Sequence, residues 1–211
     1  MNLRHVIPLA AALLLPVSVH AAEETKEPEK PKDPMVQLFK DSGCHFCHYD
    51  AHQVIGPALI EISLKYKGNK DAATELAKKI RGGTTGTWGK LNMPETPAEV
   101  SDETIGTLTQ WILARKDDPE MGEIIFAENA CYRCHDNEKP ALGPSLQSIT
   151  DKYKNNKGAK GMLLGKVRTG GSGTWGATAM PATSTNISDE SIGIVTDWML
   201  NYKPKEEPKS K

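Results

Sequence analysis

The chain has 211 residues, of which 38% are hydrophobic, 25% charged and only 6% aromatic. This composition excludes a polytopic membrane protein, a collagen and a fully disordered chain. A formal net charge of −1 provides no overall field that would attract nucleic acid or anionic lipid, so we expect neither as a partner. The four cysteines are candidates for the staple that a domain below about 80 residues often needs.

The first 22 residues are typical of a cleavable signal peptide. Arg4 precedes an almost wholly apolar run from Val6 to Val19, and the small residues Ala21 and Ala22 follow it. An uncleaved anchor helix is the alternative, but the apolar run contains prolines and is shorter than the span of about 20 residues that a bilayer requires. The sequence therefore predicts export to the periplasm, with no stable membrane insertion after the signal is removed.

A polar segment follows the signal, and another ends the chain. Residues 23–34 alternate Glu, Lys and Pro, and residues 203–211 have the same character. Segments of this composition cannot bury enough apolar surface to offset the entropy lost on ordering. We expect a flexible leader and a flexible tail.

An internal repeat with a constant offset of 87 residues organises the rest of the chain. Residues 39–113 align with residues 126–200 without a gap. A repeat of this kind predicts two tandem domains, 35–115 and 121–202. The linker, 116–120, is too short to let two domains move freely, because each residue reaches only about 3.5 Å.

The hydrophobic spacing within each repeat is helical, and no alternating strand is evident. A short helix leads to Cys44, and residues 72–81 carry apolar side chains at three- and four-residue spacing before Gly82 and Gly83 end the helix. The last helix opens at Ser101 with good N-terminal residues. An all-α fold with long loops is predicted. The first and last helices of the repeats are expected to meet through two aromatic pairs, Phe39 with Trp111 and Phe126 with Trp198.

Each repeat contains a Cys-x-x-Cys-His motif, the attachment pattern of a c-type haem. The motifs are Cys44, Cys47 and His48 in the first repeat, and Cys131, Cys134 and His135 in the second. Cysteines three apart on a helical turn face one side and can each take a haem vinyl group, while the histidine points at the iron. A thioredoxin-like pair, a zinc site and disulfides are the alternatives. The thioredoxin-like pair lacks its βαβ setting, and neither zinc nor a disulfide explains a histidine placed identically in both repeats.

Two methionines are candidate sixth ligands of the irons. Met93 and Met180 each lie 45 residues after the motif histidine, and a proline follows each of them. A thioether favours ferrous iron, so His/Met ligation raises the reduction potential relative to bis-histidine ligation. Met162 and Met199 lie on apolar helical stripes, and we interpret them as core residues.

Each repeat resembles a bacterial class I cytochrome c of the small c-551/c-552 type, and the tandem resembles dihaem cytochromes c of periplasmic electron-transfer chains. The resemblance covers residues 35–202 and includes both Cys-x-x-Cys-His motifs, both Gly-Pro and Met-Pro pairs, and the final tryptophans. It implies two small helical domains, each wrapped around a covalently bound haem c. It also implies further interactions around each haem. The carbonyls of Pro57 and Pro144 would accept hydrogen bonds from the histidines, and the haem propionates would be held by Trp88, Trp175, Arg81 and Arg168. Core packing is the alternative for the two tryptophans.

One residue departs from the family pattern in each repeat. An asparagine often stands three residues after the methionine and contacts its sulfur, whereas Thr96 and Thr183 occupy these positions here. Their hydroxyls are candidates for the same contact.

With histidine and methionine on both irons, no coordination position is open to a substrate. The sequence therefore predicts a carrier that transfers one electron at a time between periplasmic or membrane-bound redox proteins, such as an oxidase, a reductase or a quinol-oxidising complex. The alternatives are a dihaem enzyme such as a peroxidase or a thiosulfate-oxidising cytochrome, the electron-transfer subunit of such an enzyme, and a haem-based gas binder. The near-identity of the two motifs favours the carrier.

Overall fold

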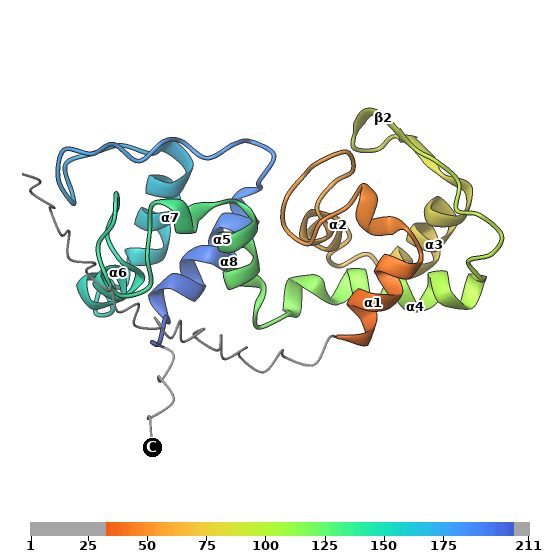
Figure 1. Cartoon of the computed structure of the whole chain (residues 1–211), viewed down its shortest axis with the longest axis horizontal. Helices are drawn as coiled ribbons and strands as arrows, with labels where there is room; N and C mark the ends of the chain where they lie inside the picture. The colour runs from red at the N-terminus through yellow and green to blue at the C-terminus, as the bar shows by residue number, and fades with distance from the viewer. Residues whose placement is uncertain (1–32, 205–211) are drawn as a thin grey trace, which may run out of the picture. The chain divides into compact units, whose positions relative to one another are not determined.

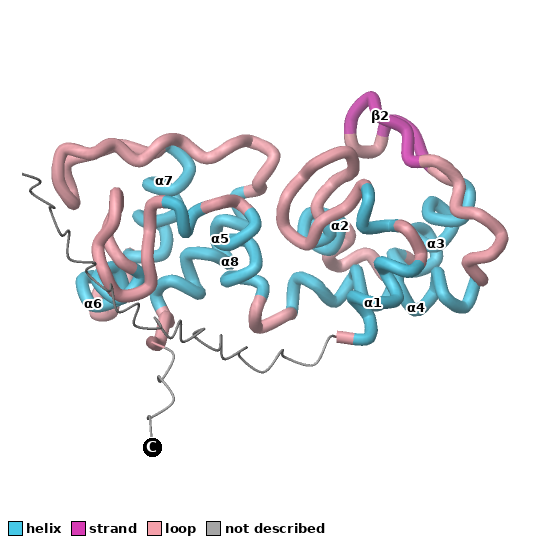
Figure 2. The backbone as a smooth tube through the Cα atoms, in the orientation of Figure 1, coloured by secondary structure: helices cyan, strands magenta, loops and turns pink. Residues whose placement is uncertain are grey.

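The described part of the chain, residues 33–204 of the computed structural model, is mostly helical (Figures 1 and 2). The predicted signal, the leader up to residue 32 and tail residues 205–211 lie outside the described residues. In chain order the elements are α1 (Pro34–Asp41), η1 (Cys44–Phe46), α2 (Leu59–Lys65), α3 (Ala72–Gly82), β1 (Thr84–Gly86), β2 (Gly89–Met93), α4 (Asp102–Ala114), η2 (Arg115–Asp117), α5 (Met121–Glu128), η3 (Cys131–Arg133), α6 (Leu146–Tyr153), α7 (Ala159–Thr169) and α8 (Asp189–Leu200), where η marks a 3-10 turn.

The helix boundaries follow the capping residues of the sequence. α1 begins at Pro34, where the Asp33 carboxylate accepts a hydrogen bond from the Met35 N–H. The Ser101 hydroxyl accepts from the Thr104 N–H at 3.1 Å and begins α4. α3 ends at Gly82, as the sequence predicts.

The prediction that no strand would form is wrong for one short segment. β1 and β2 make an antiparallel hairpin that pairs Thr84 with Met93 and Gly86 with Gly89. Gly86 and Gly89 have φ values of 73° and 111°, a region that glycine reaches without strain. The glycines permit the tight turn, and the segment is too short for hydrophobic alternation to reveal its strands.

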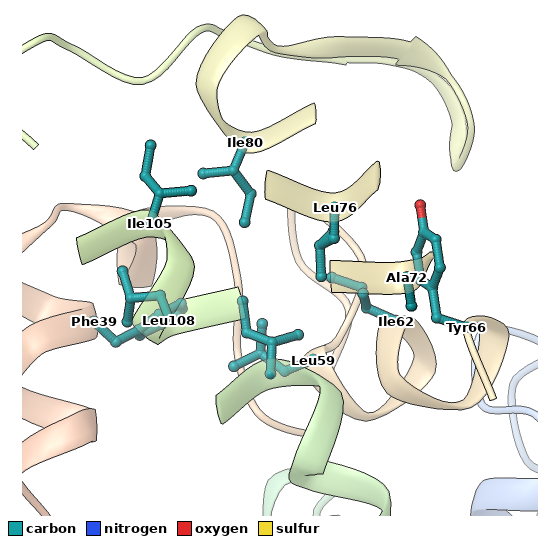
Figure 3. Packing of buried hydrophobic residues seen from close by; sticks show 10 residues of the cluster. Phe39, Leu59, Ile62, Tyr66, Ala72, Leu76, Ile80, Ile105 and Leu108 are labelled. Carbon is teal, nitrogen blue, oxygen red and sulfur yellow. The ribbon is translucent and has the colours of Figure 1, made fainter. Parts of the chain in front are cut away.

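The first repeat packs around one apolar core. Side chains from α1, α2, α3 and α4 converge there, as Figure 3 shows for Leu59, Leu76, Ile80 and Leu108. The predicted contact of Phe39 with Trp111 is confirmed, with ring centroids 5.5 Å apart.

In the second repeat, α5, α6 and α8 carry the corresponding packing. Phe126 and Trp198 lie 5.3 Å apart between ring centroids, as predicted. Met199 is buried as expected, but Met162 is 41% exposed, so its interpretation as a core residue is wrong. The buried face of α7 is narrower than its apolar residues suggest, because only Ala159 and Leu163 of this helix are buried.

The two repeats share a buried junction within one compact unit. Ala51, Ala58 and Ile60 of the first repeat belong to the same apolar cluster as residues of α5, α6 and α8, and Leu64 packs against its margin. The Glu61 side chain reaches the first turn of α8. Its Oε1 accepts two hydrogen bonds there, from the Ser188 N–H at 3.0 Å and from the Ser191 hydroxyl at 2.6 Å. α2 is therefore an interface helix as well as a core helix.

A buried cation, Arg115, stands at the end of the first repeat, next to the linker. The Arg115 side chain is only 7% exposed, and it pairs with Asp50 at 2.9 Å and with Asp118 at 2.6 Å. Its guanidinium also lies 5.0 Å from the ring of Trp111. This ion network ties the linker to the loop after His48.

The helix that corresponds to α2 in the second repeat carries a polar outer face. Gln147 and Asp151 of α6 stand where α2 has Ile60 and Leu64. The Gln147 amide donates to the Asp151 carboxylate at 2.9 Å, one helical turn away. The apolar face is thus present only on the helix that meets the other repeat.

Candidate haem sites

Each Cys-x-x-Cys-His motif begins in a 3-10 turn that directs its cysteines and histidine. In the first repeat the N–H groups of Cys47 and His48 both bond the carbonyl of Cys44, at 3.2 and 3.1 Å. Cys134 and His135 bond the carbonyl of Cys131 in the same way, at 3.1 and 3.0 Å. The spacing of the motif is therefore realised by one closed turn in both repeats.

The predicted histidine–proline contact is present in both repeats. Nδ1 of His48 lies 2.8 Å from the carbonyl oxygen of Pro57, and Nδ1 of His135 lies 2.8 Å from that of Pro144. Because a carbonyl can only accept, Nδ1 carries the proton and Nε2 is left with the lone pair that a metal needs. Burial lowers the pKa of His48, and the bond to Pro57 partly opposes this effect.

The glycine before each of these prolines lies against the imidazole ring. A Cβ on Gly56 would stand 2.4 Å from Cε1 of His48, and one on Gly143 would stand 2.6 Å from Cε1 of His135. No real Cβ tolerates such a distance, so a larger residue would have to displace the ring. Each Gly-Pro pair fixes its histidine by a hydrogen bond and by close packing.

A cavity lies between the motif and the hairpin of the first repeat. Its lining includes Cys47, His48, Pro57, Trp88 and Met93. The cavity has a volume of about 80 Å³ and opens partly to solvent. The structure thus brings the predicted histidine and methionine to one space, with mainly apolar side chains from α2 and α3 around them.

Met93 is held by the last residues of the hairpin and by the end of α3. Gly83, at φ 71°, packs so closely under this turn that a Cβ would lie 2.6 Å from the Met93 carbonyl oxygen. In the second repeat Gly171 and Met180 form an isolated bridge with two N–H to O bonds of 2.9 Å, at the positions that pair Thr84 with Met93 in the first. The two methionines therefore occupy corresponding backbone positions.

The four cysteines carry free thiols of intermediate burial. Burial raises the pKa of Cys44 above its ordinary value and raises that of Cys131 to about 11. A reactive pair of the thioredoxin type has a cysteine of lowered pKa, and Cys44 and Cys131 are shifted in the opposite direction.

Comparison with known proteins gives relatives of one kind. A cytochrome c-551 of Pseudomonas aeruginosa is 41% identical over 85 residues, which are 40% of this chain and 79% of that protein. A cytochrome c-552 of Nitrosomonas europaea is 46% identical over 79 residues, 37% of this chain and 76% of that protein. A cytochrome c-552 of Hydrogenobacter thermophilus is 44% identical over 80 residues, 38% of this chain and 80% of that protein. The chain belongs to the cytochrome c-551/c-552 family.

Two further comparisons are of the same type. Residues 117–199 of this cytochrome match the family described as "Cytochrome C oxidase, cbb3-type, subunit III". The crystal structure of Nitrosomonas europaea cytochrome c552 is 44% identical, aligns with a TM-score of 0.36, and covers 37% of this chain and 96% of its own. Membership of the cytochrome c family supports covalently bound haem c with its iron, and electron transfer rather than enzymatic activity.

The residues of the cytochrome's cavity fit a haem. The imidazole of His48 is fixed with Nε2 available, Met93 supplies a thioether on the same cavity, and the walls are mainly apolar. A porphyrin is a large apolar group with polar propionates, and both kinds of contact are offered here.

Arg81 and Arg168 hydrogen-bond the loop that follows the methionine of their own repeat. Arg81 donates to Asp102 and to the carbonyls of Thr96, Pro97 and Val100, and it does not line the cavity. Arg168 has the corresponding partners. Each arginine clamps the loop that follows its methionine, so a propionate role for it remains a prediction without structural support.

The two threonines after the methionines also serve the end of a helix. The Thr96 hydroxyl donates to the Ile80 carbonyl at 2.6 Å, and the Thr183 hydroxyl donates to the Val167 carbonyl at 2.7 Å. Each hydroxyl proton is therefore engaged by a carbonyl near the end of a helix.

The tryptophans differ between the two repeats. Trp88 lines the cavity and has the Lys65 ammonium 4.8 Å from its ring centre. Trp175 is 44% exposed, and the ammonium of Lys152 lies 4.2 Å from it. The lysine–tryptophan contact recurs, but only the first tryptophan is placed in an enclosed site.

Sequence reasoning missed Lys79, a cation on the cavity wall. Its ammonium donates to the hydroxyl of Tyr66 at 2.7 Å, and both side chains line the cavity. The internal repeat could have indicated this pair, because Lys166 and Tyr153 stand at the corresponding positions of the second repeat. Lys79 is better placed than Arg81 to meet an anionic group in the cavity.

Proposed function

We propose that this chain is a dihaem cytochrome c that carries single electrons between redox proteins of a respiratory chain. In this proposal residues 35–115 and 121–202 form tandem class I cytochrome c domains, each with one covalently bound haem c. The recurrence of the same site at an offset of 87 residues carries the proposal. The two His–Pro hydrogen bonds have the same length of 2.8 Å, and Gly171 pairs with Met180 where Thr84 pairs with Met93.

The proposed attachment residues are the four cysteines, Cys44 and Cys47 in the first repeat and Cys131 and Cys134 in the second. His48 and Met93 are the proposed iron ligands of the first site, and His135 and Met180 those of the second. A bound haem c supplies a one-electron ferric/ferrous couple. The protein's own residues hold the ligands, exclude water, and tune the potential through the Pro57 and Pro144 bonds.

The distribution of exposed apolar residues supports a partner that docks at the first repeat. Phe46 is 72% exposed, and Ile55 and Leu91 are exposed at the rim of the cavity. In the second repeat Leu142, at the position of Ile55, is also exposed, but the polar residues Arg133 and Thr178 stand at the positions of Phe46 and Leu91. An apolar patch of this size suits a brief contact with another redox protein, such as an oxidase, a reductase or a quinol-oxidising complex.

We place the protein in the periplasm. The proposed signal, residues 1–22, supports this location, because its charge, apolar run and small residues are those of an exported chain. Among residues 33–204, none of the helices combines the length and apolar character needed to cross a bilayer.

A dihaem redox enzyme, such as a peroxidase or a thiosulfate-oxidising cytochrome, or a subunit of one, is the second candidate. Such an enzyme needs two unlike haem sites, and the exposure of Trp175 is a difference of this kind. A more open second site would let Met180 leave the iron and admit a substrate.

Haem counting and spectroscopy of the ferric protein test the proposal. We expect two haems per chain and a low-spin spectrum with the methionine–iron band at full strength for both. A high-spin component assigned to the second site by a Met180→Ala variant would favour the enzyme. A single haem per chain would refute the dihaem function.

A further inference from the structure

The loop that follows His48 lies against the turn that precedes Cys131. Ala51, only 4% exposed, donates its N–H to the Glu128 carboxylate at 2.6 Å. Its carbonyl accepts from Nδ2 of Asn129 at 2.9 Å. Ala51 is the third residue after His48, and Asn129 is the second residue before Cys131. Two hydrogen bonds at Ala51 therefore join the segments next to the two haem-binding motifs, and the one from Asn129 is nearer to Cys131 along the chain.

A second connection from His48 ends in the same place. The His48 ring donates to the Pro57 carbonyl, and the next residue, Ala58, is 2% exposed. Ala58 and Ala51 belong to the apolar cluster against which Cys131 packs. The junction next to Cys131 is therefore buried and apolar at Ala51 and Ala58.

The Asn129 amide is held in the orientation that this contact needs. Nδ2 donates to the Ile125 carbonyl at 2.9 Å as well as to Ala51, so both of its hydrogens have acceptors. The corresponding residue of the first repeat is Ser42, which has no amide. The residue that corresponds to Ala51 is Glu138, which is exposed. The contact is thus particular to the junction and is not repeated in both domains.

Electron tunnelling decays less steeply through covalent and hydrogen bonds than across gaps between atoms. We propose that the Ala51–Asn129 hydrogen bond is the main route for electron transfer between the two haem sites. In this step one electron leaves the ferrous haem of one repeat, which is oxidised, and reduces the ferric haem of the other. No proton moves, and no bond is made or broken. This inference rests on the dihaem function proposed above.

The test compares variants of the haem-loaded full chain. Met93→His provides the background, because an imidazole in place of the thioether lowers the potential of the first site and drives the electron toward the second. After rapid photoreduction, the concentration-independent phase of the absorbance change measures transfer between the sites. Asn129→Ala removes the amide donor, and Ser42→Ala is the matched control at the equivalent position. Glu61→Ala is a second control that weakens the junction at a different point.

A second measurement avoids the ligand change. In half-reduced protein with both methionines present, NMR line broadening reports exchange of the electron between the sites. Hydrogen exchange of the Ala51 amide and thermal melting show in each variant whether the junction persists. Asn129→Ser repeats the loss of the amide with the residue that the first repeat carries.

We expect Asn129→Ala and Asn129→Ser to slow transfer severalfold in both measurements, while Ser42→Ala and Glu61→Ala retain the parent rate. An unchanged rate in Asn129→Ala would overturn the route. An equal loss in Glu61→Ala would also overturn it, because Asn129 would then act only by holding the repeats together. A parent with two haems and no concentration-independent phase would refute the inference alone, whereas a single haem per chain would refute the dihaem function.

Discussion

Glu61 is the residue whose removal should weaken the junction most clearly. Its carboxylate accepts from the Ser188 N–H at 3.0 Å and from the Ser191 hydroxyl at 2.6 Å, at the first turn of α8. A hydrogen bond to a charged group contributes about 1.5–3 kcal/mol, and a carboxylate at a helix N-terminus gains about 0.3–1 kcal/mol from the helix dipole. Water can replace part of these bonds in the variant, because Glu61 is only half-buried.

We therefore expect Glu61→Ala to lower the free energy of unfolding by about 2 kcal/mol. For a protein of this size that loss corresponds to a fall of about 4–8 °C in the melting temperature. Circular dichroism of the haem-loaded protein during heating measures it. Glu75→Ala is the matched control, because Glu75 also lies in the first turn of its helix but is exposed. Its effect should stay within about 0.5 kcal/mol.

A double-mutant cycle separates the contact from other effects of the substitution. Glu61→Ala and Ser191→Ala should show a coupling energy of about 1 kcal/mol, since each removes one partner of the same hydrogen bond. Equal effects of Glu61→Ala and Glu75→Ala, or strict additivity in the cycle, would refute the role assigned to Glu61.

Four other outcomes are expected. Met93→His should lower one of two resolved midpoint potentials in a redox titration, and an equal fall of both would contradict independently ligated sites. Gly56→Ala would place a Cβ 2.4 Å from the His48 ring, so the low-spin signal of one haem should be lost, and an unaltered spectrum would count against the packing described. Burial raises the pKa of Glu128 above its ordinary value of 4.5. Its contribution to stability is therefore largest at low pH and is lost as the pH rises through the folded-state pKa. Denaturant unfolding should show wild type losing stability relative to Glu128→Gln as the pH rises above 4.5, and a constant difference would be the contrary result. The chain without haem should not fold stably, and circular dichroism of a compact apo-protein would refute this.

The elements set by local chemistry could be predicted from the sequence. The apolar spacing of residues 72–81 predicts the helix α3, and the Ser101 hydroxyl caps the N-terminus of α4. The hairpin could not be predicted, because its pairing depends on glycine torsions and involves too few residues for a periodic pattern. The junction between the repeats could not be predicted either. In the sequence, apolar residues of α2 that pack against the second repeat look the same as apolar residues that pack in the core of the first.

The candidate haem site was also predicted only where local sequence determines the contact. The contact of His48 with Pro57 follows from the family pattern and is present at 2.8 Å. The position of Arg81 does not follow from it, because a guanidinium has several carbonyl acceptors within reach and only the folded loop decides among them. Lys79 was overlooked because lysines on helix surfaces are common, and its meeting with Tyr66 is a matter of tertiary structure.

The polar face of α6 determines how many repeats this architecture can hold. A head-to-tail contact, unlike a two-fold one, can in principle continue without end, and arrays of this kind need a terminal unit with a polar outer face. At that end the Gln147 amide donates to Asp151, whereas Ile60 and Leu64 of α2 pack in or against the apolar cluster of the junction. Restoring the apolar residues on α6 and fusing a further copy of residues 116–202 is therefore a way to lengthen the protein into a molecular wire, one haem at a time.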